Sequence, residues 1–217
     1  MEFYSSLASC QNLQTVTFDL RYIENNNDEK IQAFNIQNLQ YQNMIVLSIN
    51  MSSCSLTQFQ AFDLGLVQNL TSLNINLSNN KLSKFEELAA GLEKCLHLQN
   101  LDLNLSNNQI EKEAAQSIIQ SITHIQNIRI LKLDFSNTFF KLIDFNVLEG
   151  KCEKITLFSF LFEQQSLQYN QQSAIRLDQW LTNCMYLSTL KIYPTYRHSD
   201  ININKLKRKL KRFVANK

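Results

Sequence analysis

The feature that most constrains the fold is a pattern of regularly spaced leucines that recurs along the whole sequence. The stretch that starts at Leu98 reads LQNLDLNLSNNQI, and the stretch that starts at Leu70 reads LTSLNINLSNNKL. Both fit the template L-x-x-L-x-L-x-L-x-x-N-x-L. Five more stretches fit its apolar positions, so that seven copies begin near residues 13, 44, 70, 98, 128, 155 and 187. Their mean spacing of 29 residues indicates a repeat architecture that fills the chain.

Each unit changes from a period of two residues to a helical period. Leu101, Leu103 and Leu105 alternate with polar residues, which predicts a short strand with one buried face. Before the next strand, residues such as Leu88 and Leu92 recur at helical spacing. One strand and one helix cannot bury an apolar face alone, so the units must stack. We therefore expect an α/β solenoid, curved like a horseshoe, with a parallel inner sheet of about seven strands and outer helices.

A small polar position follows four of the predicted strands, whereas the first, sixth and seventh units have Ile23, Gln165 and Arg197 there. The aligned residues are Cys54, Asn80, Asn108 and Thr138, and all of them can form hydrogen bonds. The chain must turn inward here and leaves backbone groups that the sheet cannot pair. We expect buried side chains at this position to satisfy those groups and to link each unit to the next.

The motif and the spacing of about 29 residues resemble leucine-rich repeats of the ribonuclease-inhibitor-like subtype. The resemblance covers essentially the whole chain, although the apolar alternation begins two residues earlier than in the usual motif and the first and last units are degenerate. It implies a parallel α/β solenoid that works as a protein-binding scaffold. We expect the solenoid to span residues 1–198, followed by a basic C-terminal capping helix or tail at 199–217.

The composition and the motifs argue against catalysis. The chain has a formal charge of +2, 44% hydrophobic residues and only three glycines, and it contains no phosphate-binding loop, zincin motif or dinucleotide-binding motif. Its three histidines fall in different units, away from any matched nucleophile. We expect a non-catalytic protein with no cofactor, no metal and no small-molecule substrate.

The five cysteines are explained by the repeat. Cys10, Cys95, Cys152 and Cys184 each lie three residues before the first apolar residue of a unit, and Cys54 takes the polar position after a strand. No C-x-x-C pair occurs, so neither a zinc site nor a disulfide framework is indicated. We expect five reduced, buried core residues.

The inner sheet surface is the first candidate binding site. Residues between the buried strand positions point into the predicted concavity, and the larger or charged ones gather toward the C-terminal half. The candidate partner-binding residues are Asp102, Asn104, Lys132, Asp134, Leu161, Lys191 and Tyr193. The alternative is that they are ordinary solvated residues of a sheet. We expect a partner protein to bind here, with this chain acting alone or as a subunit of a larger assembly.

The basic C-terminus is the second candidate site. Residues 205–217 carry seven of the 21 basic residues and no acidic residue. Six of the seven are the candidate site residues Lys205, Lys207, Arg208, Lys209, Lys211 and Arg212, and the seventh is Lys217. An apolar stripe at helical spacing runs through the same segment, which favours a helix that covers the last unit. The alternative is a patch for nucleic acid, a membrane surface or an acidic protein surface.

A third hypothesis follows from the resemblance. Repeats of this subtype also occur in GTPase-activating proteins for the Ran-type small GTPase, which implies a possible regulatory role, with Arg21 as the only early arginine candidate.

The sequence also predicts a cytoplasmic or nuclear location. The N-terminus lacks a secretory signal, and apolar stretches such as 155–162 are too short to span a membrane. Asn-x-Ser/Thr triplets begin at Asn50, Asn69, Asn76 and Asn104. Without a secretory route we expect no glycosylation there.

Overall fold

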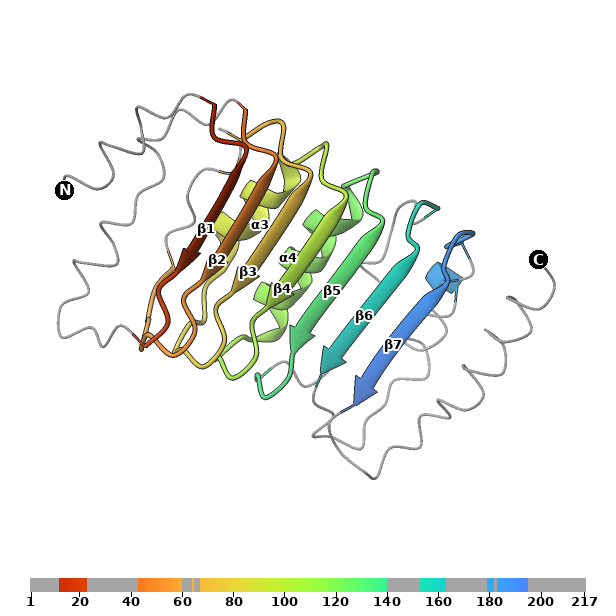
Figure 1. Cartoon of the computed structure of the whole chain (residues 1–217). Helices are drawn as coiled ribbons and strands as arrows, with labels where there is room; N and C mark the ends of the chain where they lie inside the picture. The colour runs from red at the N-terminus through yellow and green to blue at the C-terminus, as the bar shows by residue number, and fades with distance from the viewer. Residues whose placement is uncertain are drawn as a thin grey trace.

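Seven strands form one parallel sheet in the computed structural model of the chain, which describes residues 12–22, 43–59, 64, 67–139, 153–162, 179–181 and 183–194 (Figure 1). The strands are β1 Thr15–Asp19, β2 Val46–Asn50, β3 Ser72–Asn76, β4 Asn100–Asn104, β5 Ile130–Phe135, β6 Leu157–Phe162 and β7 Thr189–Pro194. Each strand pairs with the next one in sequence, so the sheet order is β1 to β7. The prediction of a parallel sheet of about seven strands is confirmed.

The alternating leucines set the register of this sheet. Leu73, Leu101 and Leu131 are direct partners across β3, β4 and β5, and each is at most 3% exposed. Shifting one strand by a single residue would move its apolar side chains to the other face, so burial fixes the pairing strongly. The leucines of neighbouring units therefore lie side by side, as the spacing predicts.

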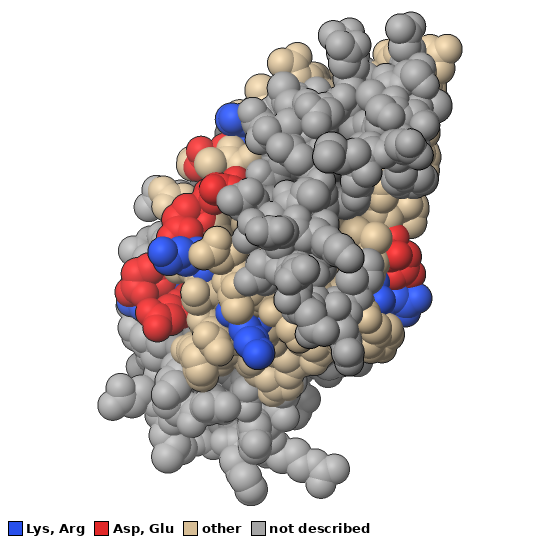
Figure 2. Space-filling model, turned by 90° about the vertical axis from the view of Figure 1, so that its left-hand side faces the viewer, with Lys and Arg blue, Asp and Glu red and all other residues tan. Residues whose placement is uncertain are grey.

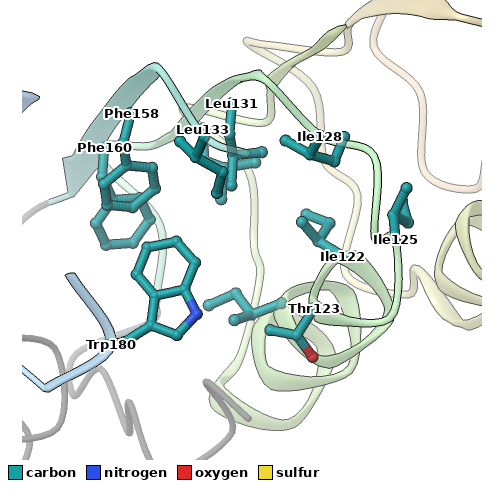
Figure 3. Close-up of a pocket in the computed structure, with 11 residues that line it drawn as sticks. Ile122, Thr123, Ile125, Ile128, Leu131, Leu133, Phe158, Phe160 and Trp180 are labelled. Carbon is teal, nitrogen blue, oxygen red and sulfur yellow. The ribbon is translucent and has the colours of Figure 1, made fainter. Parts of the chain in front are cut away.

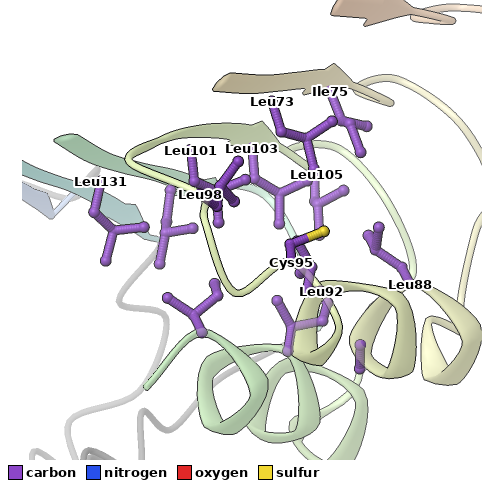
Figure 4. Packing of buried hydrophobic residues seen from close by; sticks show 14 of the residues in the cluster. Leu73, Ile75, Leu88, Leu92, Cys95, Leu98, Leu101, Leu103, Leu105 and Leu131 are labelled. Carbon is purple, nitrogen blue, oxygen red and sulfur yellow. The ribbon is translucent and has the colours of Figure 1, made fainter. Parts of the chain in front are cut away.

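Two of the expected helices are described, α3 over Glu86–Glu93 and α4 over Lys112–Thr123. Both lie on the same face of the sheet, behind it in the view of Figure 1. Figure 4 shows strand leucines, Leu101 among them, pointing toward Leu88 and Leu92 of α3. The core lies between the strands and the helices, and the α/β arrangement is confirmed.

Close packing explains one of the few glycines. Gly91 lies inside α3, where glycine is unfavourable, and it is buried. A Cβ atom at this position would lie 3.2 Å from Cδ1 of Leu64, closer than most real contacts. The absence of a side chain lets α3 approach the segment that carries Leu64.

The buried asparagines after β3 and β4 link consecutive loops as predicted, whereas Thr138 after β5 donates to the carbonyl of Phe135 within its own unit at 2.9 Å. The Oδ1 atom of Asn80 accepts from the backbone N–H groups of Cys54 and Leu56, both at 3.0 Å. Its Nδ2 atom donates to the carbonyls of Met51 and Leu77, both at 2.9 Å. One carboxamide therefore satisfies backbone groups of two consecutive loops, which otherwise would be left unpaired in the core.

A second recurring feature of these loops was not predicted. Ser53, Asn79, Asn107 and Asn137 occupy equivalent positions and have φ angles of 57°, 57°, 54° and 54°. Asparagine tolerates this left-handed conformation better than most residues, which explains its repeated use. The turn also aligns the loops, because the N–H of Asn79 donates to the carbonyl of Ser106 at 3.0 Å.

One prediction about the cysteines is wrong. Cys54 and Cys95 are free and buried, as expected, but Cys184 is disulfide-bonded. The absence of C-x-x-C pairs did not exclude this bond, because a disulfide can join cysteines that are far apart in the sequence.

Several predictions fall outside the described residues. They include the boundary at residue 198, the capping helix or tail at 199–217 and its basic residues. Within the described part of the chain, no helix is both long and apolar enough to cross a bilayer.

Candidate functional site

The face of the sheet opposite α3 and α4, here called the open face, carries three rows of side chains. Strand pairing defines each row. The leading row is Thr15, Val46, Ser72, Asn100, Ile130, Leu157 and Thr189; the central row is Thr17, Ser48, Asn74, Asp102, Lys132, Ser159 and Lys191; the last row is Asp19, Asn50, Asn76, Asn104, Asp134, Leu161 and Tyr193. The central and last rows are those that the sequence predicts.

The predicted binding residues are brought together in these two rows. Asp102, Lys132 and Lys191 belong to the central row, separated only by Ser159. The other four, Asn104, Asp134, Leu161 and Tyr193, are consecutive in the last row. For Tyr193 only the backbone position in β7 is described.

Two of the predicted residues form an ion pair across neighbouring strands. Nζ of Lys132 lies 2.7 Å from Oδ2 of Asp102, and both side chains are about half exposed. Opposite charges that face each other on adjacent strands stabilise the pairing modestly. The pair also neutralises the centre of the open face, so neither residue presents a lone charge to a partner.

The polar residues of the last row have a structural role that the sequence did not reveal. The Oδ1 atoms of Asn76, Asn104 and Asp134 each accept a hydrogen bond from the backbone N–H two residues later, at 3.0, 3.0 and 2.9 Å. Asn50 makes the same contact with Ser52 at 3.2 Å. Such turns end the strand and start the loop. The repeated Asn-x-Ser triplets are the sequence signal for them.

The leading row adds apolar residues that the prediction omitted. Val46, Ile130 and Leu157 are half-buried on the open face, and Ile130 is the direct partner of Leu157. Ser159 of the neighbouring row is 6% exposed although it lies on the same face. On each strand, the leading-row residue lies two positions before the central-row residue. Continuing the alternation by one step toward the N-terminus of each strand would therefore have predicted this row. The open face therefore combines apolar and charged side chains on β5 and β6.

Outside the open face, acidic and basic side chains lie next to each other (Figure 2). Figure 2, an end-on view, shows acidic side chains next to basic ones on both flanks. At the first strand, Arg21 is held by Asp19 through Nε and an Nη2 atom, both at 2.8 Å from the carboxylate. This contact lowers the pKa of Asp19 and raises that of Arg21. Arg21 is thus paired within its own turn, and about half of its side chain stays exposed.

An apolar cavity lies in the core and not on the open face. Strands β5 and β6, the end of α4 and the ring of Trp180 surround it, and the rings of Phe158 and Trp180 meet edge to face in its wall (Figure 3). Its volume of about 30 Å³ has room for one or two water molecules at most. Thr123 supplies the only hydroxyl in the lining, and it donates to the carbonyl of Gln120 at 2.7 Å. We interpret the cavity as a packing gap.

Two features of the described titratable groups bear on catalysis, the grouping of side chains that could bind a metal and the state of the Cys95 thiol. In the described ranges, no group of three or more His, Cys, Asp and Glu side chains could hold a metal ion. Burial raises the pKa of the Cys95 thiol to about 12, so this thiol is protonated at neutral pH. A protonated, buried thiol is a poor nucleophile.

No known family of proteins matches the chain, and no curated protein is significantly similar to it. The geometry of the open face is therefore the basis for the functional argument.

Proposed function

We propose that this chain is a leucine-rich-repeat solenoid of the ribonuclease-inhibitor-like subtype that binds a partner protein through the open face of its sheet. It acts as a non-catalytic scaffold, alone or as a subunit of a larger assembly. The C-terminal end, with its basic segment, extends the binding surface.

The repeat assignment is supported by features that recur at the spacing of the sequence motif. Asn108 repeats the contacts of Asn80 one unit later, donating to the carbonyls of Leu77 and Leu105 at 2.9 and 3.0 Å. The strand register and the turn at Asn79 and Asn107 recur with it. A unit that needs its neighbour for backbone pairing is typical of a solenoid.

The observation that carries the binding proposal is the composition of the open face over β5 and β6. The apolar side chains of Ile130, Leu157 and Leu161 are only half-buried, and charged residues such as Lys132 and Asp134 lie beside them. Apolar residues surrounded by polar ones are characteristic of protein interfaces. With a strand spacing of about 4.8 Å, the seven strands span about 29 Å.

Site-specific photo-crosslinking tests this proposal. A benzophenone side chain is placed at Asn74, which is exposed on the open face, and separately at Gln120, which is exposed on α4. Each full-length variant is irradiated in an extract of the native cells. We expect one protein to be captured from Asn74 and not from Gln120. Equal capture from both positions, or no capture from Asn74, would contradict binding through the open face.

A further inference from the structure

The middle of the open face is a floor of short, hydrogen-bonding side chains. Strands β2, β3 and β4 each contribute three positions to it. Eight of these nine residues are Ser, Asn or Asp: Ser48, Asn50, Ser72, Asn74, Asn76, Asn100, Asp102 and Asn104; the ninth is Val46. The long side chain of Lys132 borders this floor on β5, where it reaches back to Asp102. We call these nine residues the amide floor.

Three carboxamides of the amide floor have a fixed orientation. Asn50, Asn76 and Asn104 use Oδ1 to accept the backbone N–H two residues later. In Asn104, Oδ1 also accepts from the hydroxyl of Ser106 at 2.7 Å. Since Oδ1 points to the loop, Nδ2 is the outer group of each carboxamide. The Nδ2 atoms of these three asparagines donate to no group of the described residues. The last row therefore presents three oriented donors.

The spacing of the amide floor matches an extended polypeptide. Side chains two residues apart on a strand, such as Asn74 and Asn76, are separated by about 6.6–6.8 Å, and an extended chain repeats its carbonyl groups at the same interval. A segment that lies along β3 and β4 would meet an amide or hydroxyl group at each repeat. Asn76 and Asn104 are direct partners on adjacent strands, so one carbonyl oxygen of the segment would lie beside both and accept from their Nδ2 groups.

The chemistry also selects against other partners. The amide floor has no aromatic side chain, and its only charge, Asp102, is neutralised by Lys132. A strongly charged segment would lose water without gaining an opposite charge. Asparagine side chains instead offer donors and acceptors that suit main-chain groups.

From this arrangement we infer that the amide floor receives an uncharged, extended segment of the partner protein and holds it by its main chain. The inference rests on the proposed function, because it names what the partner places on the open face.

The test uses short random peptides displayed on phage and selected on the immobilised full-length protein. The selected peptides are then synthesised, and their dissociation constants are measured for wild type and for the double variant Asn76→Asp, Asn104→Asp. Aspartate keeps the acceptor that the turn needs, as Asp134 shows at the equivalent position. It replaces the Nδ2 donor by an acceptor that repels a carbonyl oxygen, so we expect binding to weaken at least tenfold.

The matched control is the double variant Asn79→Asp, Asn107→Asp. It adds the same charge on the neighbouring loops, outside the amide floor, and both residues are exposed. We expect its affinity to stay within twofold of wild type. A second measurement leaves the protein unchanged. Replacing one peptide amide by an ester makes its carbonyl a weaker acceptor, and we expect severalfold weaker binding when the ester carbonyl is the one that faces Asn76 and Asn104.

Two outcomes would overturn the inference. One is that selection enriches no peptide, and the other is that the peptides bind the Asn76→Asp, Asn104→Asp variant as tightly as wild type. If the crosslinker at Asn74 still captures a partner in either case, the proposed function stands and only the extended segment is wrong. If that crosslinker captures nothing, the proposed function itself fails.

Discussion

Asn108 donates a hydrogen bond from Nδ2 to the carbonyl of Leu77, which lies 31 residues earlier in the chain, at 2.9 Å. Its Oδ1 atom accepts from the backbone N–H of Leu82 at 3.1 Å. The side chain is 5% exposed, so water cannot replace these bonds. A single amide thus ties one loop to the preceding one, and the stability of each loop depends on its neighbour.

Replacing Asn108 by leucine should destabilise the protein strongly. The change leaves the N–H of Leu82 and the carbonyl of Leu105 without their partner, while the carbonyl of Leu77 keeps its hydrogen bond from Asn80. Each buried, unsatisfied group costs about 1–3 kcal/mol, so we expect a loss of roughly 2–4 kcal/mol. Urea unfolding measures this loss. The control is Gln109→Ala, an exposed neighbour, which should stay within about 0.5 kcal/mol of wild type.

The buried thiol of Cys95 should make stability depend on alkaline pH. Its pKa is about 12 in the folded protein and about 8.5 in an unfolded chain. Because the folded value is the higher one, the contribution is complete below about pH 8.5 and is lost progressively as the pH rises toward 12.

We expect wild type to lose on the order of 2 kcal/mol more than Cys95→Ala between pH 7.5 and pH 10.5. Tyrosines and lysines that titrate in the same pH range affect the stability of both proteins equally, so their contribution cancels in the difference. Native Cys95 should also resist iodoacetamide at pH 8.5, which peptide mass spectrometry detects. Rapid alkylation of the folded protein would show that the thiol is accessible.

The ion pair between Lys132 and Asp102 should contribute little to stability. Their side chains are 47% and 39% exposed, and such surface pairs contribute about 0–1 kcal/mol. A double-mutant cycle with Lys132→Met and Asp102→Asn measures the coupling by urea unfolding. We expect less than about 1 kcal/mol, decreasing as salt is added. A coupling several times larger would mean that the pair is shielded from solvent.

The positions of these two residues show what the sequence could predict. Alternation of apolar and polar residues assigned each strand two faces, and the equal spacing of the units placed Asp102 next to Lys132 in one row. The same reasoning identified Asn80 and Asn108 as buried links, because polar residues inside an apolar repeat need partners.

The contacts within the rows were not predictable in the same way. The side chain of Asn76 could have pointed to solvent, and only the loop geometry shows that it accepts the N–H of Ser78. The left-handed backbone conformation of residues such as Asn79 cannot be read from the periodicity of apolar residues. The disulfide of Cys184 depends on how close a second sulfur atom lies in space, which the repeat spacing does not give.

The aromatic end of the core provides the last prediction. The rings of Phe158 and Trp180 lie 5.2 Å apart at 66°, an edge-to-face arrangement that favours the pair beyond simple burial. Phe158 is 3% exposed and lines the apolar cavity. Phe158→Ala should enlarge that cavity and cost about 3–5 kcal/mol. Trp180 is the single tryptophan of the chain, so its fluorescence reports urea unfolding directly.

Leu161→Ala is the matched control, since Leu161 lies on the same strand but on the open face. There it is half-buried, and truncation removes an apolar side chain that little else covers, so we expect a loss below about 1.5 kcal/mol. If Leu161→Ala cost as much as Phe158→Ala, the open face would be packed as tightly as the core. Such a face could not receive a partner, and the proposal of binding through it would have to be abandoned.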